Sequence, residues 1–256
     1  MEERIRVAPL ERIRKENNNT TEQHSLTMSN RGVIDKDREY KPTNKNTSQE
    51  RPKFQFSIAQ WNGRSINTAS KINYIKGFKS NIIALQQIWQ RGDDIAANFE
   101  TIDIVERTVQ QGGGTATIRD KFPSYTVQKR IEINKDTVLL RINFSNNYMW
   151  FVNTYLRGGT IAKLQKLFGK IQKNVPSNEV SQMIMIGDFN IDLKDTEDNT
   201  YKLLQKLCKE IGVKIESPGR YTREGAILDY IICGRNIHIQ KGEIVKKSPS
   251  DHAAIR

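Results

Sequence analysis

A chain of 256 residues with a formal charge of +12 at pH 7 is long enough for one large domain with a buried core. Its basic excess favours a polyanionic partner. No apolar stretch approaches 18 residues and no signal-peptide core begins the chain, which excludes a membrane-spanning helix and predicts an intracellular protein, nuclear or cytoplasmic. Cys208 and Cys233, in apolar contexts without metal-like spacing, predict buried free thiols.

The first 52 residues are rich in Asn, Thr, Glu, Arg and Lys, and they predict a disordered polar leader. They hold 11 basic and 9 acidic side chains, so a net charge of +10 remains on residues 53–256. The positive field therefore belongs to the domain. Salt-dependent binding of nucleic acid is the natural interpretation, and a merely basic, soluble surface is the alternative.

The domain is predicted to begin with strand, helix and strand. Phe54–Gln60 alternates as a strand does, Ala69–Lys79 has helical spacing, and Ile82–Trp89 is a second apolar strand. This order is typical of an α/β or α+β layered fold. Asn62 follows the end of the first strand, where its amide would be accessible.

The middle of the chain predicts further strands. Gly112–Gly114 precedes Thr115–Ile118, and these glycines permit either a close backbone approach or an ordinary hairpin turn. Two alternating stretches follow, Thr137–Phe144 and Tyr148–Thr154. The second stretch leads into an aromatic hydroxyl and a guanidinium, those of Tyr155 and Arg157, at another strand end.

Two amphipathic helices are predicted in the second half, about Ile161–Asn174 and Thr200–Ile211, the latter ended by Gly212. Both carry a row of lysines. Such rows are more often solvated helix faces than DNA contacts.

An apolar strand, Met183–Ile186, stops at Gly187 and is followed by an acid and an amide, Asp188 and Asn190. A carboxylate at a strand end can orient or deprotonate a water, and an amide can hold a phosphate oxygen. The alternative for this short pattern is an Asx-type turn that closes the strand.

The end of the chain has a strand, Ile227–Cys233, and a loop with adjacent Asp251 and His252. Asp251 offers a hard oxygen for Mg²⁺, and His252 offers a proton donor if a carboxylate fixes its ring. Asp229 is the candidate for that carboxylate. An Asp-His pair alone would usually be a surface loop.

Seven short motifs together resemble the endonuclease/exonuclease/phosphatase superfamily, and the chain is most similar to the apurinic-endonuclease-like domains of non-LTR retrotransposons. The resemblance covers residues 54–256 and implies an α/β fold: a four-layered sandwich of two mainly antiparallel sheets packed face to face, with helices outside. The motifs, in chain order, are Trp61-Asn62, Ala84-Leu85-Gln86-Gln87, Gly112-Gly113-Gly114, Asn153-Thr154-Tyr155, Gly187-Asp188-Phe189-Asn190, Leu228-Asp229-Tyr230 and Ser250-Asp251-His252.

The resemblance also implies roles for the site residues. Asp188 would position or deprotonate the attacking water, and His252, held by Asp229, would stabilise charge developing on phosphorus. Asn190, Asn62 and Tyr155 would either bind the scissile phosphate or orient Asp188. The side chains expected to bind the scissile phosphate are Asn62, Asn190, Tyr155 and Arg157.

The implied cofactor is Mg²⁺, with Gln87 at the principal ligand position and Asp251 as a second ligand or an outer-shell partner. The family has Leu-Gln-Glu where this chain has Leu85-Gln86-Gln87. Loss of this carboxylate is expected to weaken metal binding by roughly one to several powers of ten.

Three functions follow from these observations. The first is a Mg²⁺-dependent endonuclease of retrotransposon origin that nicks double-stranded DNA and is impaired at Gln87. The second is a degenerate domain that binds nucleic acid without cutting it. The third, disfavoured by the basic charge, is a small-molecule or lipid phosphoesterase. The chain ends four residues after His252, which fits a standalone descendant, a truncated form, or a fragment of a product that also carries a reverse transcriptase domain.

Overall fold

A computed structural model describes residues 55–106, 112–120, 124–144, 147–239, 242–245 and 247–256. The chain divides into two units, 1–51 and 52–256, and the fold below is that of the second unit. The predicted leader, residues 1–52, and the predicted strand start at Phe54 lie outside the described residues.

The first sheet has the strand order β11-β12-β1-β2-β4-β3. β1 and β2 are parallel and are connected by α1, so the predicted strand–helix–strand start is confirmed; the other pairings in this sheet are antiparallel. The strands are β1 Ile58–Asn62, β2 Ile82–Gln86, β3 Glu100–Val105, β4 Thr115–Arg119, β11 Ile244–Val245 and β12 Ala254–Ile255.

The second sheet has the order β5-β6-β7-β8-β10-β9. β7 and β8 are parallel, and the remaining pairs are antiparallel. The strands are β5 Tyr125–Asn134, β6 Thr137–Phe144, β7 Asn147–Tyr155, β8 Met183–Asp188, β9 Val213–Glu216 and β10 Asp229–Gly234.

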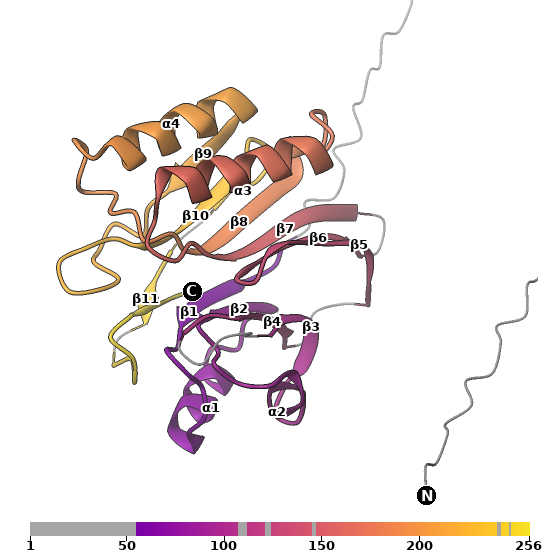
Figure 1. The fold of residues 1–256 in the computed structure, drawn as a ribbon. Coiled ribbons are helices and arrows are strands. Elements are labelled where there is room, and N and C mark those ends of the chain that lie inside the picture. Colours follow the sequence, from indigo (N-terminus) through magenta and orange to yellow (C-terminus); the bar gives the residue numbers. More distant parts are fainter. Residues whose placement is uncertain (1–54, 107–111, 121–123, 145–146, 240–241, 246) are drawn as a thin grey trace, which may run out of the picture. The chain divides into compact units, whose positions relative to one another are not determined.

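The helices cover the outer faces of the two sheets (Figure 1). α3 (Ile161–Asn174) and α4 (Asn199–Ile211) lie on the second sheet, and α1 (Ala69–Lys76) and α2 (Gly92–Ala96) lie on the first. A short 3₁₀ turn, η1 (Val180–Gln182), precedes β8. The predicted four-layered α/β sandwich is therefore confirmed.

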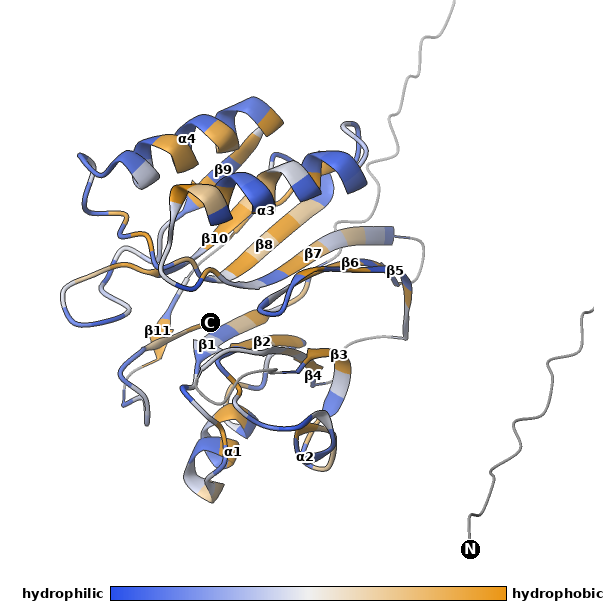
Figure 2. Cartoon of the chain, in the orientation of Figure 1, coloured by the Kyte–Doolittle hydropathy of each residue, from blue (hydrophilic) through white to orange (hydrophobic). Residues whose placement is uncertain are grey.

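Three apolar cores fill the spaces between the four layers, and the alternation of β8 shows how one strand serves two of them. Met183 and Met185 pack with α3 and α4, whereas Ile184 and Ile186 pack between the sheets. A third core joins the first sheet to α1 and α2. Figure 2 shows the apolar stretches of β7, β8 and β10 beneath the two long helices. Continuous apolar strands of this kind are typical of sheets buried on both faces.

Several element boundaries differ from the prediction for local backbone reasons. β1 begins at Ile58, and β2 ends at Gln86 because Gln87 is left-handed, with φ 51°. Gly187 has φ 150°, and a Cβ atom there would collide with the carbonyl oxygen of Thr154 on β7. The glycine of the Gly-Asp-x-Asn motif thus permits close packing of two parallel strands.

Both cysteines are free and buried, as predicted. Within the described part of the chain, no helix is long and apolar enough to cross a membrane.

Candidate active site

Three candidate residues lie in one row across the second sheet. Asp188, the last residue of β8, is in register with Tyr155 of β7 and with Asp229 of β10. Because Ile184 and Ile186 face the first sheet, the alternation of β8 directs Asp188 to the same side. The inter-sheet space is therefore apolar along most of β8 and carboxylate-lined at the C-terminal end of this strand.

The first sheet contributes the opposing polar residues from β1. Ala59 and Trp61 pack toward the helices, so Gln60 and Asn62 face the second sheet. The Nδ2 atom of Asn62 donates to Oδ2 of Asp188 at 2.7 Å. Asn62 and Asp188 are thus joined by a hydrogen bond between the two sheets.

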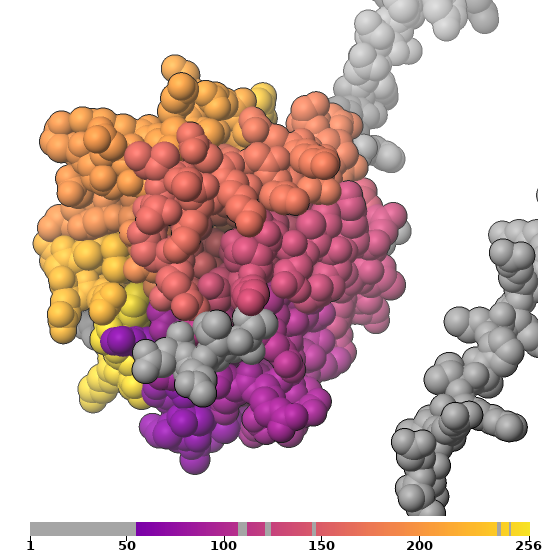
Figure 3. All heavy atoms as spheres, viewed as in Figure 1, coloured from indigo at the N-terminus to yellow at the C-terminus, as the bar shows by residue number. Residues whose placement is uncertain are grey.

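His252 lies between the two carboxylates. Its Nδ1 is 2.8 Å from Oδ2 of Asp229, and its Nε2 is 3.8 Å from Oδ2 of Asp188. All three side chains are buried, each at most 1% exposed. Yellow atoms from the end of the chain lie beside indigo atoms from the start of the domain (Figure 3), and the pairing of β12 with β1 brings these two segments together. The expected Asp229–His252 contact therefore exists, and it fixes the imidazole ring.

Burial and the neighbouring charge of Asp229 raise the pKa of Asp188 to about 7, despite the opposing effects of His252, the Asn190 N–H and Asn62. Burial alone would lower the pKa of His252, but its hydrogen bond to Asp229 and the negative charges of Asp229 and Asp188 raise it above the ordinary value. An acid with a pKa near neutrality is suited to accept a proton from water, and the adjacent imidazolium to donate a hydrogen bond.

Asn190 contributes a backbone and a side-chain group. Its N–H donates to Oδ1 of Asp188 at 2.9 Å, in the Asx-type turn that was the alternative for this motif. The backbone of Asn190 is left-handed, with φ 49°. Its side-chain Nδ2 atom is buried and has no hydrogen-bond partner among the described residues. A buried amide donor without a partner is costly unless a ligand or water completes it. The Asx-type turn is therefore formed by the two candidate site residues themselves, Asp188 and Asn190.

Tyr155, the third residue of this row, is half-buried. Burial and the charge of Asp188 raise the pKa of its hydroxyl, so the hydroxyl keeps its proton at neutral pH. Arg157 makes other contacts: its Nη2 donates to the carbonyl of Gly112 at 2.8 Å and lies 3.5 Å from Oδ2 of Asp136. A Cβ atom at Gly113 would collide with both Arg157 and Asp136, so the glycine run permits a close approach. The role of Arg157 in phosphate binding stays a prediction.

A chain of buried amides behind Asp229 was missed by the sequence reasoning. Gln60 Nε2 donates to Oδ1 of Asp229 at 2.7 Å and to Oε1 of Gln86 at 2.8 Å, and Gln86 donates in turn to Asn153 at 2.8 Å. The signal was present, because Gln60 and Gln86 are polar residues in two strands whose other residues, apart from Asn62, are apolar. These amides orient Asp229 from the side opposite His252.

The two expected metal ligands do not fit Mg²⁺ as they stand. Gln87 supplies an amide in place of a carboxylate, and Oδ2 of Asp251 is already 2.7 Å from Nη1 of Arg64 and 3.1 Å from Nε of Arg223. Mg²⁺ sites in proteins usually include one or two carboxylates, whereas the one carboxylate of this expected pair is engaged by two guanidinium groups.

A second group could hold a metal ion: within the described ranges, ligand atoms of Asp188, Asp229 and His252 lie within 4.8 Å of one another. However, all four carboxylate oxygens already accept hydrogen bonds from the protein. These hydrogen bonds fix the orientation of the two acids and the imidazole, as proton transfer requires, and each oxygen keeps a further lone pair.

The arginines near Asp251 were also missed, and no sequence signal identified them. Arg64 contacts Asp251 from a loop in which Arg64 and Ser65 adopt left-handed conformations, φ 41° and 79°. Arg223 arrives from the loop between β9 and β10. Neither placement follows from a local pattern.

No protein-family model matches the chain, and no curated protein matches it either. Among solved structures, the endonuclease domain of TRAS1, a telomere-specific non-LTR retrotransposon, superposes with a TM-score of 0.60 at 14% identity, over 78% of this chain and 96% of that domain. An AP endonuclease from Archaeoglobus fulgidus has a TM-score of 0.54 at 17% identity, over 78% and 98%. D. rerio TDP2, humanized by 14 mutations, has a TM-score of 0.55 at 15% identity, over 78% and 96%.

At these identities the likeness concerns the fold. Together with the two packed sheets and their outer helices, it confirms the fold that the seven motifs predicted. The chain therefore shares the fold of these three proteins.

Proposed function

We propose that this chain is a nuclease-type phosphodiesterase that nicks double-stranded DNA and shares its origin with the endonuclease domains of non-LTR retrotransposons. The observation that carries the proposal is the state of Asp188. This carboxyl group is buried, has a pKa of about 7, and lies between Asn62 and the imidazole of His252. Such a group is placed to take a proton from water at neutral pH.

The step that these residues support is in-line hydrolysis. The water oxygen forms a bond to phosphorus as its proton passes to Asp188, and the bond from phosphorus to the leaving oxygen breaks. The leaving oxygen takes a proton from solvent, and Asp188 later returns its proton to solvent. The His252 imidazolium, held by Asp229, donates a hydrogen bond to a phosphate oxygen as charge accumulates there.

Two further donors complete the phosphate site in this proposal. Asn190 Nδ2, which is buried without a partner in the described structure, points to a ligand that accepts a hydrogen bond. The protonated hydroxyl of Tyr155, in the same row as Asp188, would serve a second phosphate oxygen. No step is assigned to Mg²⁺, because Gln87 and Asp251 do not suit it.

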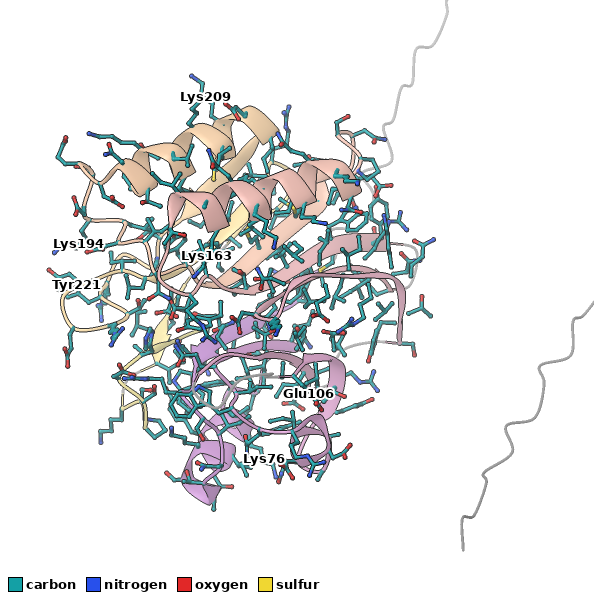
Figure 4. All side chains as sticks on the ribbon, in the orientation of Figure 1. Lys76, Glu106, Lys163, Lys194, Lys209 and Tyr221 are labelled. Atoms are coloured by element: carbon teal, nitrogen blue, oxygen red, sulfur yellow. The ribbon has the colours of Figure 1, made fainter. Side chains whose placement is uncertain are left out.

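DNA as the substrate is supported by charge and by the structural neighbours. The net charge of +10 lies on residues 53–256, and the TRAS1 and Archaeoglobus fulgidus neighbours are both described as endonucleases. A cationic and aromatic pair, Lys194 and Tyr221, lies on neighbouring loops at one edge of the domain (Figure 4), with the ammonium 4.3 Å from the ring centroid. Such pairs suit contact with a sugar-phosphate backbone and bases.

One specific observation favours a second function, DNA binding without cleavage. The ion pairs of Asp251 and the neutral Gln87 remove the metal position that the resemblance implies. A retained phosphate site with no activating ion would bind DNA and leave it intact.

The test is nicking of supercoiled plasmid by the natural chain, by Asp188→Ala and by His252→Ala. We expect nicking by the natural chain and loss of at least about a hundredfold in rate in each variant, since each removes a proton-transfer or charge-stabilising group. Asp195→Ala is the control, because Asp195 is an exposed carboxylate away from the row. Equal nicking by natural chain and Asp188→Ala would reject the assignment. An intact plasmid that is nevertheless bound would establish the second function.

A further inference from the structure

The carboxylate of Asp251 forms ion pairs with arginines from two separate parts of the chain. Arg64, in the loop after β1, lies 2.7 Å from Oδ2, and Arg223, in the loop between β9 and β10, lies 3.1 Å from the same oxygen. All three side chains are partly exposed, at 47% for Arg64, 38% for Arg223 and 24% for Asp251. The cluster is thus accessible from solvent.

Arg64 is held in place by its backbone. Its N–H donates to Oδ1 of Asn62 at 3.2 Å, so Asn62 connects Arg64 to Asp188. The ammonium group of Lys71 on α1 donates to three successive carbonyl groups of this loop at 2.7 to 3.2 Å, those of Gly63, Arg64 and Ser65. Left-handed conformations at two consecutive residues are costly, and these bonds offset that cost. These hydrogen bonds fix the loop that carries the Arg64 guanidinium.

Gln87 lies next to this loop. The N–H of Ser65 donates to the carbonyl of Gln87 at 2.7 Å, and that of Gly63 to the carbonyl of Gln86 at 3.1 Å. Gln87 and Arg64 therefore lie on neighbouring backbone segments that continue two parallel strands. Around Asp251 itself, one carboxylate is paired with two guanidinium groups, and this local excess of positive charge repels a divalent cation and attracts a phosphate.

We propose that Arg64, positioned on Asp251 together with Arg223, is the resident cation of the site, and that a DNA phosphate binds there without a divalent metal ion. The inference rests on the proposed function in placing that phosphate beside Asp188. Nη1 of Arg64 contacts Asp251, so the other N–H groups of the planar guanidinium can form paired hydrogen bonds to phosphate oxygens. The neutral side chain of Gln87 is consistent with a site whose positive charge comes from arginine.

The first test measures metal binding directly, by the loss of the free Mn²⁺ signal in electron paramagnetic resonance. The natural chain should bind no stoichiometric Mn²⁺ at millimolar concentration. The double variant Gln87→Glu/Arg64→Ser, which restores a second carboxylate and removes one guanidinium, should gain one site. Stoichiometric binding by the natural chain that disappears in Asp251→Asn would overturn the proposal, as would a double variant that folds by circular dichroism yet gains no site.

The second test measures binding of a short fluorescein-labelled duplex by anisotropy, in EDTA and in Mg²⁺ at matched ionic strength. We expect the same Kd within about twofold in the two buffers. Arg64→Gln should weaken binding about tenfold or more, because it removes a paired phosphate contact. The matched control is Arg256→Gln: Arg256 is also paired with a carboxylate, that of Glu243, and is 44% exposed against 47% for Arg64. It lies beyond β12, away from Asp251, and should change Kd less than about twofold.

The outcomes separate this inference from the proposed function. Binding that EDTA abolishes, or equal effects of Arg64→Gln and Arg256→Gln, would overturn the resident-cation proposal. Nicking that requires Mg²⁺ and stops in EDTA would also overturn it while leaving the proposed function intact. Plasmid that is bound without metal, through Arg64, but never cut would support the inference and reject the nuclease.

Discussion

Asp188→Asn should make the protein more stable at pH 8 while abolishing its activity. The folded state holds the Asp188 proton more tightly than the unfolded state, because burial and Asp229 raise its pKa from 3.8 to about 7. Ionisation of Asp188 therefore lowers the stability of the folded state as the pH rises above the pKa of the unfolded state. The loss is complete once the pH exceeds the pKa of the folded state. At 1.36 kcal/mol per pKa unit, the full cost is about 4 kcal/mol.

The pH dependence follows from the same shift. At pH 8 the cost is about 4 kcal/mol, and at pH 5, where the folded group is protonated, it is below about 2 kcal/mol. Asparagine is neutral at both pH values. Its NH₂ group, however, replaces one carboxylate oxygen that accepts a hydrogen bond, so this donor faces another donor, either the N–H of Asn190 or the side-chain NH₂ of Asn62. That mismatch costs about 1–3 kcal/mol at any pH. The net gain at pH 8 is thus about 1–3 kcal/mol, and at pH 5 it is near zero or negative.

The assay is urea denaturation of natural chain and variant at pH 5 and pH 8. The difference between the two pH values, about 2–3 kcal/mol, does not depend on the mismatch and is the decisive quantity. Asp94→Asn, at an exposed carboxylate in α2, should show no such difference. A variant whose stability relative to the natural chain is the same at pH 5 and pH 8 would refute the argument that Asp188 is desolvated.

Three further predictions concern partner, leader and packing. Duplex affinity should fall about tenfold or more between 50 and 200 mM salt, as basic residues release counterions; anisotropy titrations measure it. Deleting residues 1–52 should leave the melting temperature and duplex affinity nearly unchanged, because most net charge lies beyond them. Gly187→Ala should lower the free energy of unfolding by more than about 2 kcal/mol, because the added Cβ atom collides with Thr154. Gly169→Ala, in open space on α3, should raise it by about 0.5–1 kcal/mol, and calorimetry measures both changes.

Contrary results would be specific. Salt-independent affinity would point away from a phosphate backbone as the partner. A large drop in melting temperature on deletion would show that residues 1–52 pack on the domain. Equal effects of the two glycine substitutions would contradict the close approach of β7 and β8.

The layers of the fold could be predicted because strand periodicity and ordered motifs are local signals. β6 and α3 match their predicted ranges, Thr137–Phe144 and Ile161–Asn174, since each follows a clear alternation or helical spacing. Short elements such as α2 and β11 carry too few residues for a periodic pattern. β2 was predicted three residues too long because apolar character continues through Ile88, whereas the left-handed backbone of Gln87 ends the strand.

For the site, the predicted carboxylates and histidine do meet, because strand ends at one edge of a sheet collect polar residues. What could not be predicted is the use of Asp251. Its partners depend on the path of two loops. Arg64 and Ser65 have positive φ values, which residues of these types usually avoid, so the sequence does not predict this backbone path. The buried amides Gln60 and Gln86 are an intermediate case, visible as polar interruptions but not assignable to Asp229 without the register of the two sheets.

The most direct test of the central claim, that Asp188 activates water against a DNA phosphodiester, is nicking in ¹⁸O-labelled water followed by mass spectrometry of the new strand ends. Hydrolysis at this site predicts one ¹⁸O atom in each new terminal phosphate with the natural chain, and no labelled ends above background with Asp188→Ala. Unlabelled terminal phosphates, labelled ends that persist in Asp188→Ala, or no strand breaks by the natural chain would contradict it.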